Sequence, residues 1–99
     1  MDLPETERVQ IIEVCRRYRA KKIILFGSRA TGQNTPVSDI DIAVSGADDF
    51  DGLSADLKYN DFTLLDIDIV NLEDRLSREL TEDIARDGVV LYEEKVYEP

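Results

Sequence analysis

Two aspartates one residue apart, Asp39 and Asp41, form the part of the sequence best suited to chemistry. If this segment is a β-strand, alternation places both carboxylates on one face of the sheet and Ile40 on the other. Two carboxylates this close repel each other unless they are solvated, share a proton or hold a cation. A Gly27-Ser28 pair ends an apolar run ten residues earlier, and such a small turn could approach a phosphate. Together, a cation and a phosphate turn indicate metal-assisted phosphoryl or nucleotidyl transfer.

The composition narrows the chemistry that is available. The 99 residues suffice for one domain with a modest core, and 42% of them are hydrophobic, which is typical of a globular protein. The sequence contains no His, so Ser-His and Cys-His catalysis and His-based zinc sites are excluded. The single Cys15 excludes an internal disulfide, and no apolar run is long enough to span a membrane. We expect a cytoplasmic protein.

The charge balance bears on the choice of partner. The formal net charge is −10, from 22 acidic and 12 basic residues. Nucleic acid would be repelled, so we expect no direct binding to it, whereas a cation or a basic protein partner fits. Ordinary solubility explains the overall charge equally well.

Hydrophobic periodicity predicts alternating helices and strands, which together make a layered α/β domain. The expected elements are a helix over 5–20, a strand over 22–26, a turn or short helix within 28–35, a strand over 38–45, an acidic loop over 46–52, a short helix over 53–59, a strand over 64–70, a helix capped by Asn71 and ending at Gly88, a strand over 89–92, and a loose tail over 93–99. The first helix should bury a stripe that includes Val9, Ile12 and Cys15, with Cys15 as a small core residue.

The chain resembles the minimal nucleotidyltransferases of the DNA polymerase β-like superfamily. The shared pattern is an apolar strand, Gly27-Ser28, ten intervening residues, Asp39-Ile40-Asp41, and an acid on a later strand within 64–70. The resemblance covers nearly the whole chain as a single domain. It implies the nucleotidyltransferase fold, an α/β arrangement in which helices flank a small mixed sheet.

The resemblance also implies roles for individual residues. Asp39, Asp41 and a third acid would hold Mg²⁺, with two ions expected, and ATP would be the substrate. Gly27 and Ser28 would bind the triphosphate. Arg29 would offset phosphate charge, although it could equally be a solvated loop residue.

The third acid is a choice between two aspartates on the same face of the predicted strand, Asp66 and Asp68. Alternation cannot separate them. The family pattern of an apolar residue, Asp, two further apolar residues and Asn favours Asp68, because Asp68 is followed by Ile69, Val70 and Asn71. Asp66 would then be a charge at the rim.

The acceptor is expected to be a protein. Stand-alone members of this size look like the antitoxins of bacterial and archaeal toxin–antitoxin pairs, beside a HEPN-domain ribonuclease toxin. The resemblance implies transfer of AMP from ATP to a tyrosine of the toxin. A non-catalytic antitoxin that blocks its partner sterically and a transferase acting on a small molecule remain alternatives, and either a homo-oligomer or a hetero-oligomer is compatible with the sequence.

Overall fold

The computed structural model describes residues 1–95 and contains a single four-stranded sheet. The elements in chain order are α1 (Glu5–Arg17), β1 (Lys22–Phe26), α2 (Ser28–Thr31), β2 (Ile40–Ser45), α3 (Phe50–Lys58), β3 (Ile67–Asn71), α4 (Arg78–Asp87) and β4 (Val89–Glu93). None of the helices in this part of the chain has the length and hydropathy needed to cross a bilayer.

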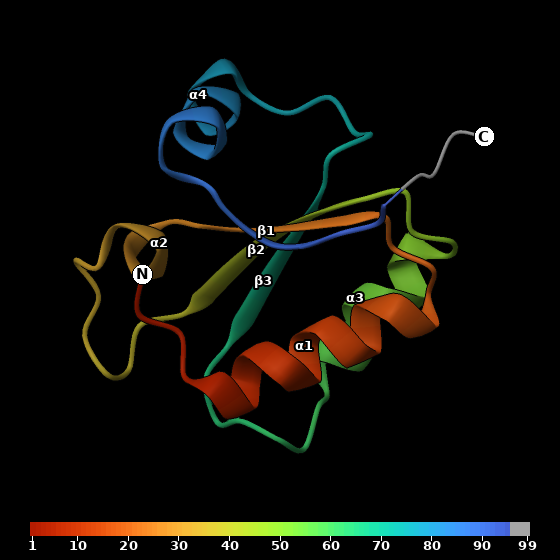
Figure 1. Cartoon of the computed structure of the whole chain (residues 1–99), viewed down its shortest axis with the longest axis horizontal. Helices are drawn as coiled ribbons and strands as arrows, with labels where there is room; N and C mark the ends of the chain where they lie inside the picture. The colour runs from red at the N-terminus through yellow and green to blue at the C-terminus, as the bar shows by residue number, and fades with distance from the viewer. Residues whose placement is uncertain (96–99) are drawn as a thin grey trace.

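The sheet has the strand order β3-β2-β1-β4 and is mixed. β1 pairs antiparallel with β2 and with β4, whereas β2 and β3 are parallel. A parallel pair requires a crossover connection, and α3 provides it. Figure 1 shows α1 and α3 on one face of the sheet and α4 on the other. The predicted α/β class with a mixed sheet flanked by helices is confirmed.

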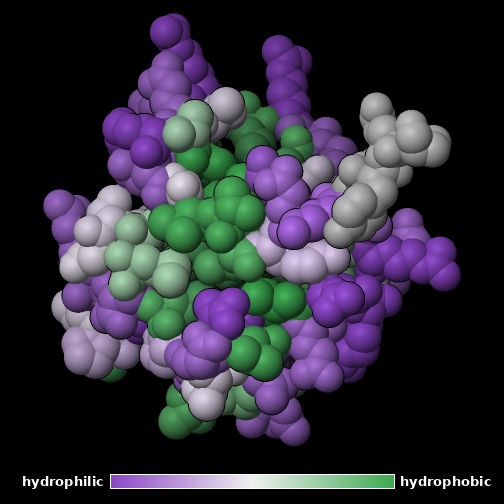
Figure 2. Space-filling model, in the orientation of Figure 1, coloured by the Kyte–Doolittle hydropathy of each residue, from purple (hydrophilic) through white to green (hydrophobic). Residues whose placement is uncertain are grey.

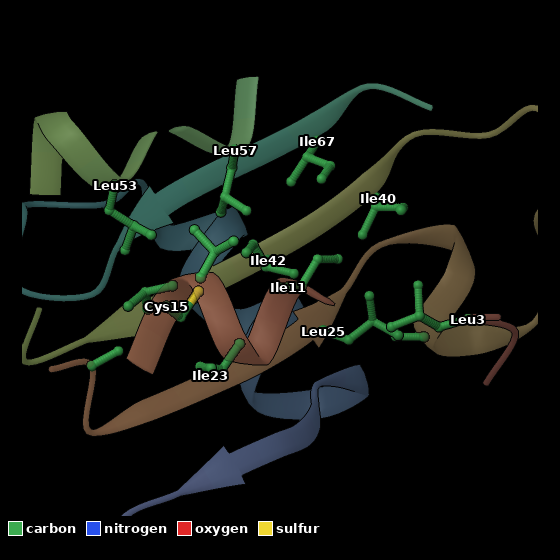
Figure 3. Packing of buried hydrophobic residues seen from close by; sticks show 14 residues of the cluster. Leu3, Ile11, Cys15, Ile23, Leu25, Ile40, Ile42, Leu53, Leu57 and Ile67 are labelled. Atoms are coloured by element: carbon green, nitrogen blue, oxygen red, sulfur yellow. The ribbon is translucent and has the colours of Figure 1, made fainter. Parts of the chain in front are cut away.

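The main core lies between the sheet and the pair α1 and α3. Alternate residues of β1 and β2 point into it, and Figure 3 shows Ile23 and Ile42 packed against Ile11 and Cys15 of α1. Leu53 joins them from α3. Cys15 is fully buried, and burial raises the pKa of its thiol to about 12, which confirms that it is a core residue.

A smaller core lies on the α4 face. Phe26, Ala43 and Ile84 are buried there, and the half-buried Leu72 and Leu76 pack against them. The face that carries Phe26 and Ala43 is also the face of the even-numbered side chains of β1 and the odd-numbered side chains of β2, so Asp41 belongs to this side of the sheet.

Two predictions about helices were wrong. Val9 is 45% exposed, because the buried side of α1 is centred on Ile11, Val14 and Cys15. The helix expected from Asn71 begins only at Arg78, after a Ser77 cap whose hydroxyl accepts from the Leu80 N–H at 3.1 Å.

Other predicted boundaries moved by a few residues. α3 begins earlier than expected, at Phe50, because the Asp49 carboxylate caps it by accepting from the Gly52 N–H at 3.1 Å. The strands expected to begin at residues 38 and 64 begin at Ile40 and Ile67. The last strand extends one residue further than expected, to Glu93, and most of the expected tail lies in 96–99, outside the described residues.

Apolar surface remains visible on the outside of the molecule. Figure 2 shows an apolar area in the middle of one face, surrounded by hydrophilic side chains. The exposed apolar side chains include Val9 of α1 and Val90 of β4.

Candidate active site

The parallel pairing of β2 and β3 places Asp41 directly opposite Asp68. Both side chains point to the α4 face, where Asp41 is half-buried and Asp68 is exposed. Burial, the neighbouring charge and hydrogen bonding of Asp68, and the charge of Asp39 together raise the pKa of Asp41 to about 6. The fold therefore concentrates negative charge around Asp41.

Asp39 and Asp66 are the residues that immediately precede the two strands. Asp39 is exposed and close enough for its charge to raise the pKa of Asp41. Asp66 is also exposed, but it is not among the groups that raise this pKa, and its carbonyl accepts from the Ile40 N–H at 2.9 Å. The structure thus places Asp39, Asp41 and Asp68 near one another, and Asp66 is not part of the group that raises the pKa of Asp41.

Gly27 lies against the carboxylate of Asp41. β1 ends with Phe26 opposite Asp41, so Gly27 follows at the end of the neighbouring strand. Its φ of 74° and ψ of −159° belong to a region that is essentially restricted to glycine. A Cβ at this position would lie 2.3 Å from Asp41 Oδ2. This close approach requires the absence of a side chain.

Ser28 begins α2 immediately after this turn. The Gly27 carbonyl accepts from the N–H groups of Ala30 and Thr31, at 3.1 and 3.3 Å. In residues 1–95, neither the Ser28 hydroxyl nor the N–H groups of Ser28 and Arg29 have a protein partner. The start of a helix leaves such donors available to an anion.

The side chain of Arg29, the next residue, is buried, and only 2% of the residue's surface is exposed. Its guanidinium donates to the Ser38, Asp2 and Pro36 carbonyls at 3.0, 3.1 and 3.2 Å, and more weakly to the Thr35 carbonyl at 3.4 Å. The alternative of a solvated loop residue was wrong. The donors that a phosphate would need are thus directed at carbonyls of the loop before Asp39 and of Asp2, and Arg29 joins this loop to the N-terminal segment.

A hollow of about 310 Å³ opens between α2 and the end of α4. Gly27 and Ser28 line one side, and Asp83, Arg86 and Asp87 line the other. Arg86 Nη2 is 2.9 Å from carboxylate oxygens of both Asp83 and Asp87. The sequence did not predict that these α4 residues line the hollow, because only the packing of α4 against β1 brings them beside the Gly-Ser turn.

The donor set suits a hard divalent cation. Three carboxylates supply the oxygen ligands that Mg²⁺ prefers, and a cation would offset the charge that raises the pKa of Asp41. Within residues 1–95, no three acidic, Cys or His side chains converge as a ready-made metal-binding group. Asp39 and Asp68 are both exposed, so their side chains are not held in place by packing.

Known proteins share parts of this chain and its fold. A protein of Methanocaldococcus jannaschii named "putative protein adenylyltransferase" is 53% identical over 45 residues, which are 46% of this chain and 45% of that protein. The chain thus matches less than half the length of this curated relative. The 45 matched residues are too few to carry over what the whole relative does.

Three solved structures resemble it over most of its length. A toxin–antitoxin with AMP-PNP gives a TM-score of 0.71 at 30% identity and covers 87% of this chain and 73% of that chain. A mutant of the toxin–antitoxin MntA-HpeT gives a TM-score of 0.70 at 31% identity and covers 93% of this chain and 74% of that chain. A tri-AMPylated Shewanella oneidensis HEPN toxin in complex with MNT antitoxin gives a TM-score of 0.57 at 27% identity and covers 87% of this chain and 69% of that chain.

The family match agrees with the geometry of the sheet. Residues 9–96 match the family described as polymerase beta, nucleotidyltransferase, and this span includes the Gly-Ser turn and all three carboxylates. The chain therefore belongs to the polymerase beta nucleotidyltransferase family.

Proposed function

We propose that the chain is a Mg²⁺-dependent protein adenylyltransferase that transfers AMP from ATP to a tyrosine of a HEPN-domain toxin, and so acts as its antitoxin in the cytoplasm. One observation carries the catalytic part of this proposal. The sheet register sets Asp41 beside Asp68 and against Gly27, with the charge of Asp39 nearby. A negatively charged cluster of this kind, next to the Gly-Ser turn, suits a metal-bound nucleotide.

Similar proteins support the choice of substrate and partner. The M. jannaschii relative carries the name of a protein adenylyltransferase. Two of the similar structures are named for AMP-PNP and for an AMPylated HEPN toxin bound to an MNT antitoxin. We therefore propose ATP as the nucleotide and a hetero-oligomer with a HEPN-domain protein as the working complex.

The proposed reaction forms a bond from the acceptor oxygen to the α-phosphorus of ATP. The bond from that phosphorus to the bridging oxygen breaks, and pyrophosphate leaves. Asp39, Asp41 and Asp68 would hold Mg²⁺, which supplies charge stabilisation for the attacking and leaving oxygens. Asp68, which is exposed and lies at the edge of the sheet, would accept the proton of the attacking hydroxyl.

The remaining site residues would bind and position the nucleotide. Gly27 allows the triphosphate to approach the backbone, and Ser28 offers its hydroxyl and N–H. Arg29 is left out of this set, because its donors already bind the carbonyls of Asp2, Pro36 and Ser38. It would act indirectly, by holding the chain that leads into Asp39.

The test is incubation of the protein with labelled ATP, Mg²⁺ and the HEPN-domain toxin of the proposed pair. We expect label on the HEPN protein with the wild type and with Asp61→Ala, which removes an exposed loop carboxylate outside the site. We expect none with Asp39→Ala. Equal labelling by Asp39→Ala, or none by the wild type, would contradict the proposal.

A second function is favoured by one observation, namely that the carboxylates in residues 1–95 do not form a ready-made metal group. In that case the chain would neutralise its partner by binding alone. Co-expression separates the two. If an Asp39→Ala/Asp41→Ala double variant protects cells from the toxin as well as the wild type does, the steric function holds and the catalytic one is dispensable.

A further inference from the structure

β3 forms one edge of the sheet, and half of its backbone groups point away from β2. In a parallel pair, alternate residues of a strand bond to its neighbour. The bonds from the Ile40 N–H to the Asp66 carbonyl and from the Leu72 N–H to the Val44 carbonyl show that the even-numbered residues of β3 face β2. The N–H and C=O groups of Ile67 and Ile69 therefore point outward, with no partner in residues 1–95.

A hollow of about 430 Å³ follows this edge. It is lined by residues of β3 and of the segment just before it, and by two residues of α3; these are Asp66, Ile67, Asp68, Ile69, Ser54 and Lys58. Side chains of both faces of β3 contribute, so the hollow includes the strand edge itself. Asp68 thus belongs both to the carboxylate cluster and to the wall of this hollow.

We propose that an extended segment of the acceptor protein adds to the open edge of β3 as a fifth strand. This inference rests on the proposed function. Adjacent strands lie roughly 4.8 Å apart, and side chains directly opposite each other have Cβ atoms roughly 5 Å apart. A hydroxyl-bearing residue paired with Asp68 would therefore stand beside the carboxylate that is to accept its proton. Backbone hydrogen bonds to Ile67 and Ile69 would supply affinity.

The same geometry specifies a second feature of the acceptor segment. Asp66 lies two residues before Asp68, on the same side of β3, and is exposed. An added strand presents side chains two residues apart to these two carboxylates. A basic side chain opposite Asp66 would pair with it, whereas an acidic one would be repelled. The expected partner segment thus carries a basic residue two positions from the residue that bears the acceptor hydroxyl.

Amide hydrogen exchange in the complex with the HEPN-domain protein tests the added strand directly. We expect the Ile67 and Ile69 amides of the wild type to exchange at least tenfold more slowly in the complex than alone. The Val70 amide, which already faces β2, should change little. Unchanged exchange at Ile67 and Ile69 in a complex that transfers label would overturn this inference and leave the proposed function intact.

A proline at Ile69 provides a kinetic test. It removes an outward N–H without removing a bond to β2, and proline is tolerated in edge strands on that side. We expect Ile69→Pro to raise the KM for the protein acceptor at least fivefold relative to Ile69→Val, with the KM for ATP unchanged. An acceptor KM equal to that of Ile69→Val would overturn the inference. If the proline variant does not fold, hydrogen exchange decides.

Charge reversal at the rim tests the basic residue. Asp66→Lys should raise the KM for the protein acceptor at least fivefold. Asp61→Lys, which changes the net charge equally at an exposed loop position, should leave it near the wild-type value. Equal effects of the two variants would show that only overall charge matters and would overturn this part of the inference.

Discussion

Replacing Gly27 with alanine probes the contact on which the site depends. The new Cβ would lie 2.3 Å from Asp41 Oδ2 and 3.1 Å from its Cγ. In addition, the backbone dihedrals of 74° and −159° are strained for any residue with a side chain. The backbone term costs roughly 2 kcal/mol. Turning the Asp41 carboxylate away adds about 1 kcal/mol. The total is therefore roughly 3 kcal/mol.

Gly32 provides the matched control. It has a similar φ of 82°, but a Cβ there would meet nothing within 4 Å. Gly32→Ala should therefore cost only the left-handed backbone term, about 1 kcal/mol. For a domain of this size 1 kcal/mol lowers Tm by roughly 4–8 °C. We expect a loss of that order for Gly32→Ala and about three times as much for Gly27→Ala.

Thermal unfolding with and without Mg²⁺ and ATP is the assay. Gly32→Ala should keep the ligand-dependent rise in Tm, and Gly27→Ala should lose it, because Asp41 is displaced. In an Asp41→Ala background the alanine at Gly27 meets no carboxylate, so its cost should fall by about 1 kcal/mol. If the two glycine variants lose the same Tm and keep the same ligand response, the argument from the Gly27–Asp41 contact is refuted.

Two further predictions concern Asp41 and Arg29. Because the folded-state pKa of Asp41 is raised from an ordinary 3.8 to about 6, the folded state binds the proton more tightly and loses stability as pH rises through this window. Chemical denaturation at several pH values, without metal, measures the free energy of unfolding of the wild type and of Asp41→Asn. The difference between the two should show this loss. At pH 7, Mg²⁺ should restore the lost stability in the wild type only. If the stability of the two proteins depends on pH in the same way, the raised pKa of Asp41 is contradicted. Arg29→Lys should destabilise the protein by roughly 2–3 kcal/mol, because the backbone carbonyls of Asp2, Pro36 and Ser38 lose guanidinium donors. A raised KM for ATP at unchanged Tm would instead indicate a phosphate-binding role.

Local patterns predicted the elements but not all of their boundaries. Leu72, Leu76, Leu80 and Ile84 recur at the spacing of a helix and all pack on one core, but the first two belong to a non-helical connection. Asn71 is able to cap a helix, but here its side chain accepts from the Glu73 N–H at 3.0 Å, at the end of β3. The same side-chain chemistry favours turns and caps alike, so the sequence does not distinguish them.

In the candidate site, the sequence predicted the features that depend on one strand but not the contacts between distant segments. Alternation along each strand predicted that Asp66 and Asp68 share a face, but only the register of β2 against β3 shows that Asp68 is the one opposite Asp41. Arg29 follows the Gly-Ser turn in sequence, yet α2 directs it into the protein. Arg86, 59 positions from Gly27, instead lines the hollow beside that turn. Strand periodicity specifies the face on which a side chain lies. The neighbours that complete a site are specified by sheet order, parallel pairing and helix direction, which are long-range properties. For the same reason the open edge of β3, where we place the acceptor, follows from strand order and not from any motif.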